Sequence, residues 1–372
     1  AKVMIETAER LGIETTVSLI MGYPEENLDD LRDTTAMYMH SMRHPGSSPQ
    51  LNLLAPLAGT PIYSRHKEQM VLEDLGSAMS HQGRTQNEAD RELIRRYPHI
   101  FPNFYLLPAP GLDRAFCIEL REFLRFGEVR LRWLLTALHQ SGSGILDVFS
   151  QWRERRIRLH PDLRGGDLRH YYMHRLFADE FVGFVRYRLP HLQNPAVVAL
   201  VNWYETFIEQ EARDSQLPRE HPPASGAPFP GDIPVRLPHI HVLELEWDIQ
   251  SVIDSVKRAA APRHSRTRKS YRTAETKLGA SRLIEITPLV ARGLQICDGE
   301  HTVEQFIAGI SECFEGSHEL RRRAAACLLD GIRKKGFIEI YRDPSLGDTS
   351  VTEYGLTGLI AREQNELAAQ AQ

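Results

Sequence analysis

The sequence predicts an α/β protein that begins with part of a parallel sheet, continues as a mostly helical extension and ends in a small α+β module. Three observations lead to this fold class. Helix and strand patterns alternate at the start of the chain, apolar stripes at helical spacing fill residues 68–212, and a strand, three helices and a strand follow near residues 282–340. The 372 residues suffice for two or three domains, and 42% hydrophobic and 25% charged residues are ordinary for a globular chain.

The first elements are a helix and a strand. Residues 1–11 carry the apolar spacing of a helix end with Gly12 at its C-cap, and residues 13–21 are rich in β-branched side chains. Such a run is typical of a strand buried on both faces in a parallel sheet. Since the chain has no initiator Met and begins inside a helix pattern, we expect a C-terminal fragment of a longer protein.

A second helix and a second strand follow. Asn27, with Asp30 three residues later, is expected to cap a helix that runs to about Met42. Residues 44–49 have the composition of a loop, and a strand is expected over 51–55. Strands joined through a helix are parallel. Because two strands do not make a stable parallel sheet alone, we expect further strands before residue 1.

Changes of composition divide the chain into five predicted segments. Seven prolines between 214 and 238 indicate a linker with polyproline character. Residues 257–277 carry eight Lys or Arg and one acid, and a solvated loop between strands explains this run better than a nucleic-acid patch. The segments are the end of the parallel sheet at 1–67, the helical extension at 68–213, the linker at 214–239, the module at 240–343 and a tail at 344–372.

The C-terminal module has the clearest pattern. Thr287 is expected to cap a short helix that has Pro288 at its first position. Thr302 and Gln305 form a capping box for a second helix, and a third helix leads into a returning strand. This order resembles a small winged-helix module. The predicted buried faces of the second and third helices are Val303, Phe306, Ile307 and Ile310, and Leu320, Ala324, Cys327 and Leu328.

Charge and cysteine content narrow the classes of function. The 45 Lys and Arg against 49 Asp and Glu give a net charge of −4, which removes overall basicity as an argument for a nucleic-acid partner. No stretch approaches a membrane span, so no membrane partner is expected. The four cysteines show no CxxC or CxxxCxxC spacing, and we expect them to be buried small side chains of a cytoplasmic protein. They are Cys117, Cys297, Cys313 and Cys327.

One histidine pair has metal-ligand spacing. His170 and His174 stand four residues apart in a predicted helix, but Arg169 and Arg175 flank them and no third ligand is apparent. We therefore assign no metal ligands. No GxSxG, P-loop, HExxH or kinase motif occurs either, so the residues themselves leave the catalytic residues unknown.

Two motifs near the start resemble a known family. The late barrel strand of radical SAM enzymes, apolar-Ile-x-Gly-x-Pro-Gly-Glu-Thr, is similar to Val17-Ser-Leu-Ile-Met-Gly-Tyr-Pro-Glu-Glu-Asn27. This run departs from the pattern at Glu25, where the family has Gly, and at Asn27, where it has Thr. The family's next strand ends in Pro-x-x-Gly-Thr-Pro, as does Pro56-Leu-Ala-Gly-Thr-Pro-Ile-Tyr63. The resemblance covers residues 1–65 and implies the last strands of a partial (β/α)₆ barrel, so the segment 1–67 is expected to be the end of a radical SAM barrel.

The resemblance also implies a cofactor site. In the family the first of these strands backs the adenine of S-adenosylmethionine, which places Ile20 and Gly22 at the nucleotide. The turn after the next strand contacts the adenine edge, which places Leu54, Ala55 and Pro56 there. The position of these residues at strand ends agrees with the implied cofactor site, because ligands of parallel sheets bind at the carboxyl ends of the strands. The residues alone leave a second interpretation open, in which Gly22 is only part of a turn.

The family's chemistry requires more than this chain contains. Radical SAM enzymes hold a [4Fe–4S] cluster with three thiolates of a CxxxCxxC-type loop after the first barrel strand, and an electron donor reduces the cluster. The resemblance therefore implies cluster ligands outside this chain, and the fragment alone is expected to be inactive. The long helical extension resembles enzymes that also bind cobalamin and methylate unactivated carbons, which implies cobalamin-dependent C-methylation.

The other end of the chain resembles the peptide chaperone of pyrroloquinoline quinone biosynthesis. The similarity rests on residues 289–304, with their Cys-Asp-Gly turn, and on residues 328–338, with their Gly-Phe-Ile return. Such domains recognise leader peptides of ribosomally made natural products, and an exposed strand edge accepts a peptide as an added strand. The predicted peptide-binding residues are Leu283, Ile284, Glu285 and Ile286.

Two alternatives for this module remain open at the level of sequence. It could be a winged helix that serves only as a structural cap, or one that binds DNA, against which the acidic Glu300, Glu304 and Glu312 argue. For the whole chain, the expected function is that of a radical SAM enzyme fragment that modifies a ribosomally made peptide. The alternative is a non-catalytic peptide-binding adaptor with a degenerate barrel.

Overall fold

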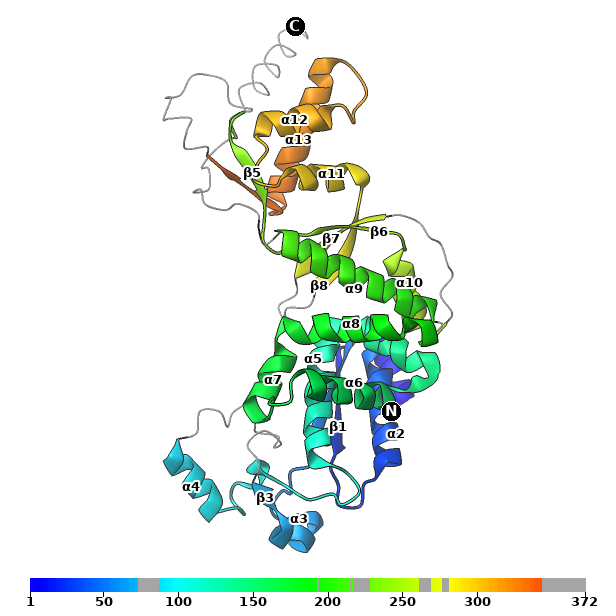
Figure 1. The fold of residues 1–372 in the computed structure, drawn as a ribbon, viewed down its shortest axis with the longest axis vertical. Helices are drawn as coiled ribbons and strands as arrows, with labels where there is room; N and C mark the ends of the chain where they lie inside the picture. Colours follow the sequence, from blue (N-terminus) through cyan, green and yellow to red (C-terminus); the bar gives the residue numbers. More distant parts are fainter. Residues whose placement is uncertain are drawn as a thin grey trace. The chain divides into compact units, whose positions relative to one another are not determined.

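The computed structural model describes residues 1–72, 87–192, 194–214, 216, 228–260, 269–275 and 281–342. These residues form a mixed α/β structure with thirteen α-helices and four small open sheets (Figure 1). The chain divides into two compact units. Unit 1 comprises Ala1–Asn202 and Ile249–His264, and unit 2 comprises Trp203–Asp248 and Ser265–Gln372. Among the described residues, none of the helices has the length and apolar character needed to cross a membrane.

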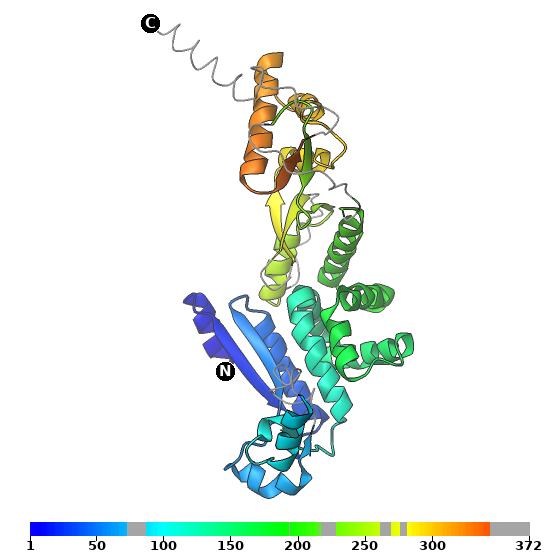
Figure 2. The ribbon, with the colours of Figure 1, turned by 90° about the vertical axis from the view of Figure 1, so that its left-hand side faces the viewer.

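Unit 1 begins with a βαβ segment. Strands β1 (Thr15–Met21) and β2 (Ser47–Leu53) pair in parallel and are connected by α2 (Leu28–Met42). Helix α1 (Lys2–Arg10) precedes them, and α2 and α5 lie along one face of the sheet (Figure 2). The predicted parallel pairing is confirmed. So is the predicted cap of α2, where the Asn27 side chain accepts from the backbone N–H of residues 29 and 30.

Two expectations for these strands were wrong. The first strand is not buried on both faces, because Thr16, Ser18 and Ile20 are exposed and β2 is the only strand paired with β1 among the described residues. The second strand begins at Ser47, inside the predicted loop, with Pro49 opposite Val17. Proline, which has no N–H to donate, is tolerated in β2 because an edge strand leaves part of its backbone without a partner strand.

The rest of unit 1 is mostly helical. Helix α5 runs along the sheet, α6 to α8 pack around it, and α9 crosses from unit 1 into unit 2. Two short strands, β3 and β4, pair antiparallel although α4 lies between them in sequence, and β3 lies near α3 (Figure 1). The bounds are α3 Pro61–His66, β3 Val71–Leu72, α4 Glu88–Arg96, β4 Tyr105–Leu106, α5 Arg114–Leu138, α6 Ile145–Leu159, α7 Gly165–Met173, α8 Arg175–Leu192, α9 Pro195–Asp214 and α10 Ile249–Lys257.

An aromatic core holds these helices together. The Phe123 ring on α5 lies 5.1 Å from that of Phe149 and 5.3 Å from that of Phe181, while Trp152 lies 5.3 Å from Phe181. All four side chains are fully buried, and the apolar stripes of the sequence include Phe123 and Phe181 but not Phe149 or Trp152. Leu176 is an exception, since it is 42% exposed although it falls in one of those stripes.

Unit 2 contains two small antiparallel sheets. Strand β5 (Ile233–Arg236) pairs with β9 (Ile338–Tyr341), and β6 (Val242–Leu245), β7 (Lys269–Glu275) and β8 (Ser281–Ile286) form a sheet in that order. The two strands that flank the three helices therefore belong to different sheets. A winged-helix arrangement is thus not established, and the coarser statement that this unit is α+β holds.

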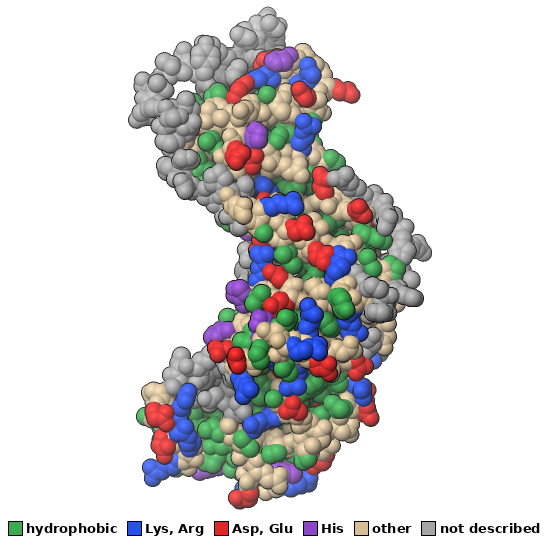
Figure 3. Space-filling view, in the orientation of Figure 1, with side chains coloured by type: hydrophobic (Ala, Val, Ile, Leu, Met, Phe, Trp, Pro, Cys, Tyr) green, Lys and Arg blue, Asp and Glu red, His purple; other side chains and the backbone are tan. Residues whose placement is uncertain are grey.

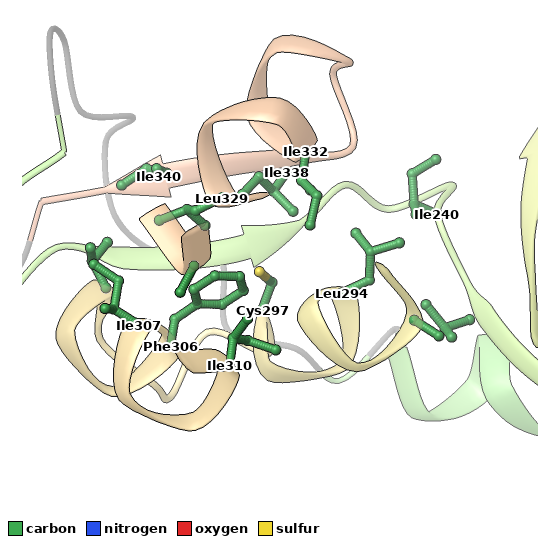
Figure 4. Close-up of a cluster of buried hydrophobic side chains, with 14 residues drawn as sticks. Ile240, Leu294, Cys297, Phe306, Ile307, Ile310, Leu329, Ile332, Ile338 and Ile340 are labelled. Atoms are coloured by element: carbon green, nitrogen blue, oxygen red, sulfur yellow. The ribbon is translucent and has the colours of Figure 1, made fainter. Parts of the chain in front are cut away.

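Three helices and the β5–β9 pair enclose the core of unit 2. They are α11 (Pro288–Ile296), α12 (Val303–Ser311) and α13 (His318–Lys334), and the caps predicted at Thr287 and Thr302 are confirmed. The predicted inner face of α12 is confirmed as well, since all four of its residues are buried. Figure 4 shows the side chains that meet in this core, among them Leu294, Cys297, Phe306, Ile307, Ile310, Leu329, Ile332, Ile338 and Ile340.

The predicted buried face of α13 was only partly right, since Leu328 is partly buried and packs against the core. Ala325, Leu329 and Ile332 are the buried residues, whereas Leu320 is 56% exposed and Cys327 is exposed. A shift of one residue rotates a helix face by about 100°. Both faces of α13 carry apolar residues at helical spacing, so the pattern alone did not separate them.

Two segments expected to lack regular structure contain strands. Residues 233–236, in the predicted linker 214–239, form β5, and residues 269–275, in the predicted loop 257–277, form β7. The compact unit begins at Trp203, before the predicted module boundary at 240, because β5 pairs with β9. The predicted tail at 344–372 lies outside the described residues.

The cysteines divide into two kinds. Cys117 and Cys297 are buried, as predicted, with exposed fractions of 2% and 0%. Cys313 and Cys327 are exposed, so for these two the expectation of burial was wrong. Cys313 lies in the turn after α12, and Cys327 lies on the face of α13 that the core does not use.

Candidate functional site

The strand ends of unit 1 bring several predicted nucleotide-side residues together. Met21 pairs with Leu53, and the Leu54 backbone N–H donates to the Met21 carbonyl at 2.8 Å. Gly22 follows with φ +88°, and a Cβ on it would lie 3.9 Å from the Leu54 nitrogen. Gly22 and Leu54 are therefore neighbours at the carboxyl ends of β1 and β2, where ligands of parallel sheets bind.

Glu26 organises the turn after β1. Its carboxylate accepts the backbone N–H of Gly22 and, at 3.2 Å, that of Tyr23. Glu26 is only 8% exposed, and a Cβ on Gly111 would lie 2.8 Å from the Glu26 carbonyl oxygen, so the chain before α5 packs tightly on this turn. Both turn amides are thus bonded within the chain. The turn offers shape and apolar surface to a ligand rather than hydrogen-bond donors.

The predicted adenine wall is only partly accessible. Ile20 is 44% exposed and presents its side chain on the open face of the sheet. Leu54 is buried at 7% exposure, Pro56 is buried and Ala55 is half-buried. Ile20 is therefore the residue of this group that offers a ligand the most surface, while the Leu54 and Pro56 side chains are packed inside the protein.

The open face of the β1–β2 sheet is polar apart from Ile20. The parallel register places Thr16 opposite Ser48, Ser18 opposite Gln50 and Ile20 opposite Asn52. The Asn52 amide donates to the Ser18 hydroxyl at 3.2 Å. The opposite face is apolar and packs on α2 and α5, so the two faces have different roles. The polar row on the open face was not predicted, although the alternating hydroxyl and amide side chains of the two strands are visible in the sequence.

Strand β8 is the outer strand of its sheet among the described residues. It pairs with β7 along one side, and Leu283, Ile284 and Ile286 are half-buried. Glu285 is exposed and accepts a hydrogen bond from Lys269 at 3.0 Å. Leu283 to Ile286, the predicted peptide-binding residues, thus lie together on an edge strand, the geometry that strand addition requires.

A cavity of about 430 Å³ opens in unit 1 between α5, α6 and the start of α7. Its buried carboxylate, Glu119, accepts hydrogen bonds from Arg153 at 3.0 Å, Arg156 at 2.8 Å and Tyr172 at 2.9 Å. Glu119, Arg153 and Arg156 in its wall are therefore paired with one another. Over the face seen in Figure 3, Lys and Arg are likewise interspersed with Asp and Glu.

The cysteines of this chain do not form a cluster site. Cys117 belongs to unit 1, while Cys297, Cys313 and Cys327 belong to unit 2. Burial, followed by the charges of Glu26 and Asp113, raises the pKa of the Cys117 thiol to about 12, the opposite of what thiolate ligation needs. Three thiolates for an iron–sulfur cluster must come from residues other than these.

The His170 and His174 pair does not share a helix. Helix α7 ends at Met173, and the His174 Nδ1 accepts the backbone N–H of Leu176 at 3.2 Å at the start of α8. His174 therefore lies between the two helices and accepts a hydrogen bond from the first turn of α8. This geometry removes the basis of the i, i+4 ligand spacing.

Comparison with known proteins gives no family. No family model matches the chain, and no curated protein matches it. The functional assignment therefore depends on the geometry of the strand-end site and of the β8 edge.

Proposed function

We propose that this chain is the C-terminal part of a radical SAM enzyme that modifies a ribosomally made peptide. One observation carries the proposal. The parallel β1–β2 pair has an open polar face that ends, at its carboxyl edge, in an exposed Ile20 and the Gly22 turn. A polar face on a parallel sheet is unusual, because helices normally cover both faces.

The residues of the open face fit a nucleoside. Thr16, Ser18 and Asn52 offer hydroxyl and amide groups for ribose oxygens and amino-acid groups, and Ile20 offers apolar contact for a base. S-adenosylmethionine has all of these parts. Gly22, which is buried and whose amide is bonded to Glu26, shapes the turn and contributes no donor.

Ligands of the remaining cofactors are not assigned among the residues that the structure describes. A [4Fe–4S] cluster would supply the electron that cleaves the sulfonium of S-adenosylmethionine, and cobalamin would supply a methyl carrier in a C-methylating enzyme. The separated cysteines do not fit a cluster, and no described residue is assigned to cobalamin. The role of this chain is therefore to bind and orient, with S-adenosylmethionine at the strand ends and the peptide at β8.

The peptide partner is proposed to add to β8 as a further strand. Backbone hydrogen bonds along Leu283–Ile286 would hold the peptide, and the half-buried side chains of this strand would contact alternate peptide residues. Glu285 is the charged residue of this edge and pairs with Lys269 of the neighbouring strand β7, so a leader peptide with a basic residue beside Glu285 fits it.

The first test addresses the enzyme. The full-length gene product, reconstituted without oxygen with iron and sulfide, is expected to release 5′-deoxyadenosine from S-adenosylmethionine when reduced. Ile20→Asp should weaken S-adenosylmethionine binding about tenfold, since it removes roughly 1.5 kcal/mol of apolar contact. Ile13→Asp is the matched control, because Ile13 is also exposed but precedes β1. A full-length protein without a CxxxCxxC segment would refute the enzyme and leave the adaptor.

The second test addresses the peptide. Candidate leader peptides are added to the full chain, and protection of backbone amides from hydrogen exchange is measured. Protection is expected at residues 281–286 and not at β9. Glu285→Lys should change the affinity of a charged leader peptide. Glu339→Lys, the same change at an exposed side chain of β9, should not change this affinity. Equal effects of the two variants would contradict binding at β8.

A further inference from the structure

Four metal-binding side chains meet where α1 faces the end of α2 in unit 1. Glu6 and Glu9 stand three residues apart on α1, so they share a face of that helix. His40 lies in the last turn of α2, and His44 follows two residues after the helix ends. The imidazole rings of His40 and His44 are 5.0 Å apart between centroids.

The donor atoms are close enough for one ion. Glu6, His40 and His44 each offer one ligand atom, and these atoms lie within 4.8 Å of one another. The Nε2 of His40 is 3.7 Å from a carboxylate oxygen of Glu6. Ligands around a tetrahedral zinc lie about 3.3 Å apart, given bonds of about 2.0–2.1 Å, so small side-chain rotations close the site. No other such group occurs in the part of the chain that the structure describes.

The histidines carry ring nitrogens that lack a partner. Both His40 Nε2 and His44 Nε2 are buried without a hydrogen bond. The His44 side chain is 8% exposed, and its Nε2 is withdrawn from solvent. A buried polar atom without a partner is costly and calls for an explanation. A bound cation would satisfy both nitrogens.

Glu9 completes the arrangement. Its carboxylate is bonded to His44 Nδ1, which fixes the ring and leaves Nε2 as the ligand atom. A carboxylate behind a histidine in this way is the usual outer partner of a metal-bound imidazole. Glu6, at 49% exposure, gives the ion a path from solvent.

We propose that Glu6, His40 and His44 bind a zinc ion, with Glu9 holding His44 in place and water as the fourth ligand. Imidazole and carboxylate donors in a four-coordinate geometry suit Zn²⁺. Arg43, whose guanidinium is 3.6 Å from the Glu6 carboxylate, competes for Glu6 in the absence of the ion and remains beside it when the ion is bound. The ion would cross-link α1 to the end of α2.

The experiment measures zinc binding to the full chain in a Cys313→Ser, Cys327→Ser background, which removes the exposed thiols. Competition with a chromophoric chelator is expected to show one strong site and a rise in Tm. Co²⁺ should give the visible bands of a tetrahedral complex. Glu6→Gln and His40→Ala should abolish the strong site, and Glu9→Gln should weaken it roughly 10- to 100-fold.

His170→Ala is the matched control, since His170 is an exposed histidine of the same unit. It should leave the strong site unchanged. Far-UV circular dichroism and the Tm without metal show whether each variant is folded, and Glu6→Gln, at a half-exposed position, is the variant least prone to disturb packing. Retention of the strong site in folded Glu6→Gln and His40→Ala, or absence of a strong site in the parent chain, would overturn the proposal.

Discussion

The strongest prediction concerns Asp214, a buried carboxylate at the end of α9. It accepts hydrogen bonds from Arg236 at 2.8 and 3.3 Å, from His241 at 2.7 Å and from Gln210 at 2.8 Å. Asp214, Arg236 and His241 are 3%, 6% and 5% exposed. One acceptor thus joins α9 to β5 and to the residue that precedes β6.

Asp214→Asn should destabilise unit 2 by about 3–5 kcal/mol, because it leaves the Arg236 guanidinium buried without a counter-charge. The amide also turns an N–H₂ donor toward groups that are themselves donors. Glu209→Gln is the matched control. It breaks the ion pair with Arg213, a pair at 3.5 Å in which both side chains are about two-thirds exposed, so it should change stability by less than about 0.5 kcal/mol.

Hydrogen exchange followed by mass spectrometry measures the effect within unit 2. Since about 1.4 kcal/mol corresponds to a factor of ten, amides of α12 and β9 should exchange roughly 100- to 3,000-fold faster in Asp214→Asn. In Glu209→Gln they should be unchanged. An increase of less than tenfold in Asp214→Asn would show that the buried ion pair contributes little, and the reasoning would fail.

The same site predicts a dependence on pH. Burial by itself would raise the pKa of Asp214, but the hydrogen bond from His241 and the charge of Arg236 outweigh it, so the pKa lies below its usual value. A carboxyl whose pKa is lowered by folding stabilises above its unfolded pKa, about 3.9, and this stability is lost as pH falls through the folded value. Unit 2 should therefore weaken below about pH 4, and less steeply in Asp214→Asn.

Two further predictions are simple to check. Gly22→Ala should lower the free energy of unfolding by about 1–2 kcal/mol because Gly22 has φ +88°. Gly183→Ala, in α8 with open space around its Cβ, should raise it by up to about 1 kcal/mol. Thermal unfolding of both variants measures the difference, and equal shifts in Tm would contradict the prediction. Iodoacetamide at pH 8 should label Cys313 and Cys327 in the native protein and spare Cys117, whose pKa burial raises; rapid labelling of Cys117, read by mass spectrometry, would contradict its burial.

Local signals in the sequence predicted the helix starts well. The capping boxes at Asn27 and Thr302 and the Pro288 start of α11 all depend on residues within four positions of one another. Such contacts form wherever the helix forms, whatever the rest of the chain does. The same locality explains why Gly22 was recognised as a turn residue before its φ was known.

Pairings between distant segments could not be predicted in the same way. Strand β5 lies in a proline-rich run, and Pro234 is opposite Ile340, more than a hundred residues later. The composition of this run favours a linker, and residues 233–236 form a strand only because β9 pairs with them. On α13, the choice between the stripe with Leu320 and the stripe with Leu329 is made by the opposing core, which includes Phe306.

The position of the strand-end residues was predicted, but not the hydrogen bonds around them. The motif placed Ile20, Gly22 and Leu54 at the ends of neighbouring strands, and they lie there. It did not predict that Glu26 bonds the Gly22 amide, because a carboxylate four residues away has many other possible partners. Side-chain hydrogen bonds inside a turn depend on rotamers that a sequence pattern does not specify.

The open face of the β1–β2 sheet limits what can cover it. A packed helix would require apolar side chains on this face, and Thr16, Ser18 and Asn52 would then be buried hydroxyls and an amide. The hydrogen bond from Asn52 to Ser18 satisfies only part of what these groups can bond, and an apolar helix face has nothing to offer the rest. Water or a polar ligand satisfies them. Since Ile20 interrupts the polar row next to the strand ends, the proposed nucleoside ligand, with an apolar base and a polar ribose, would match both parts of the face.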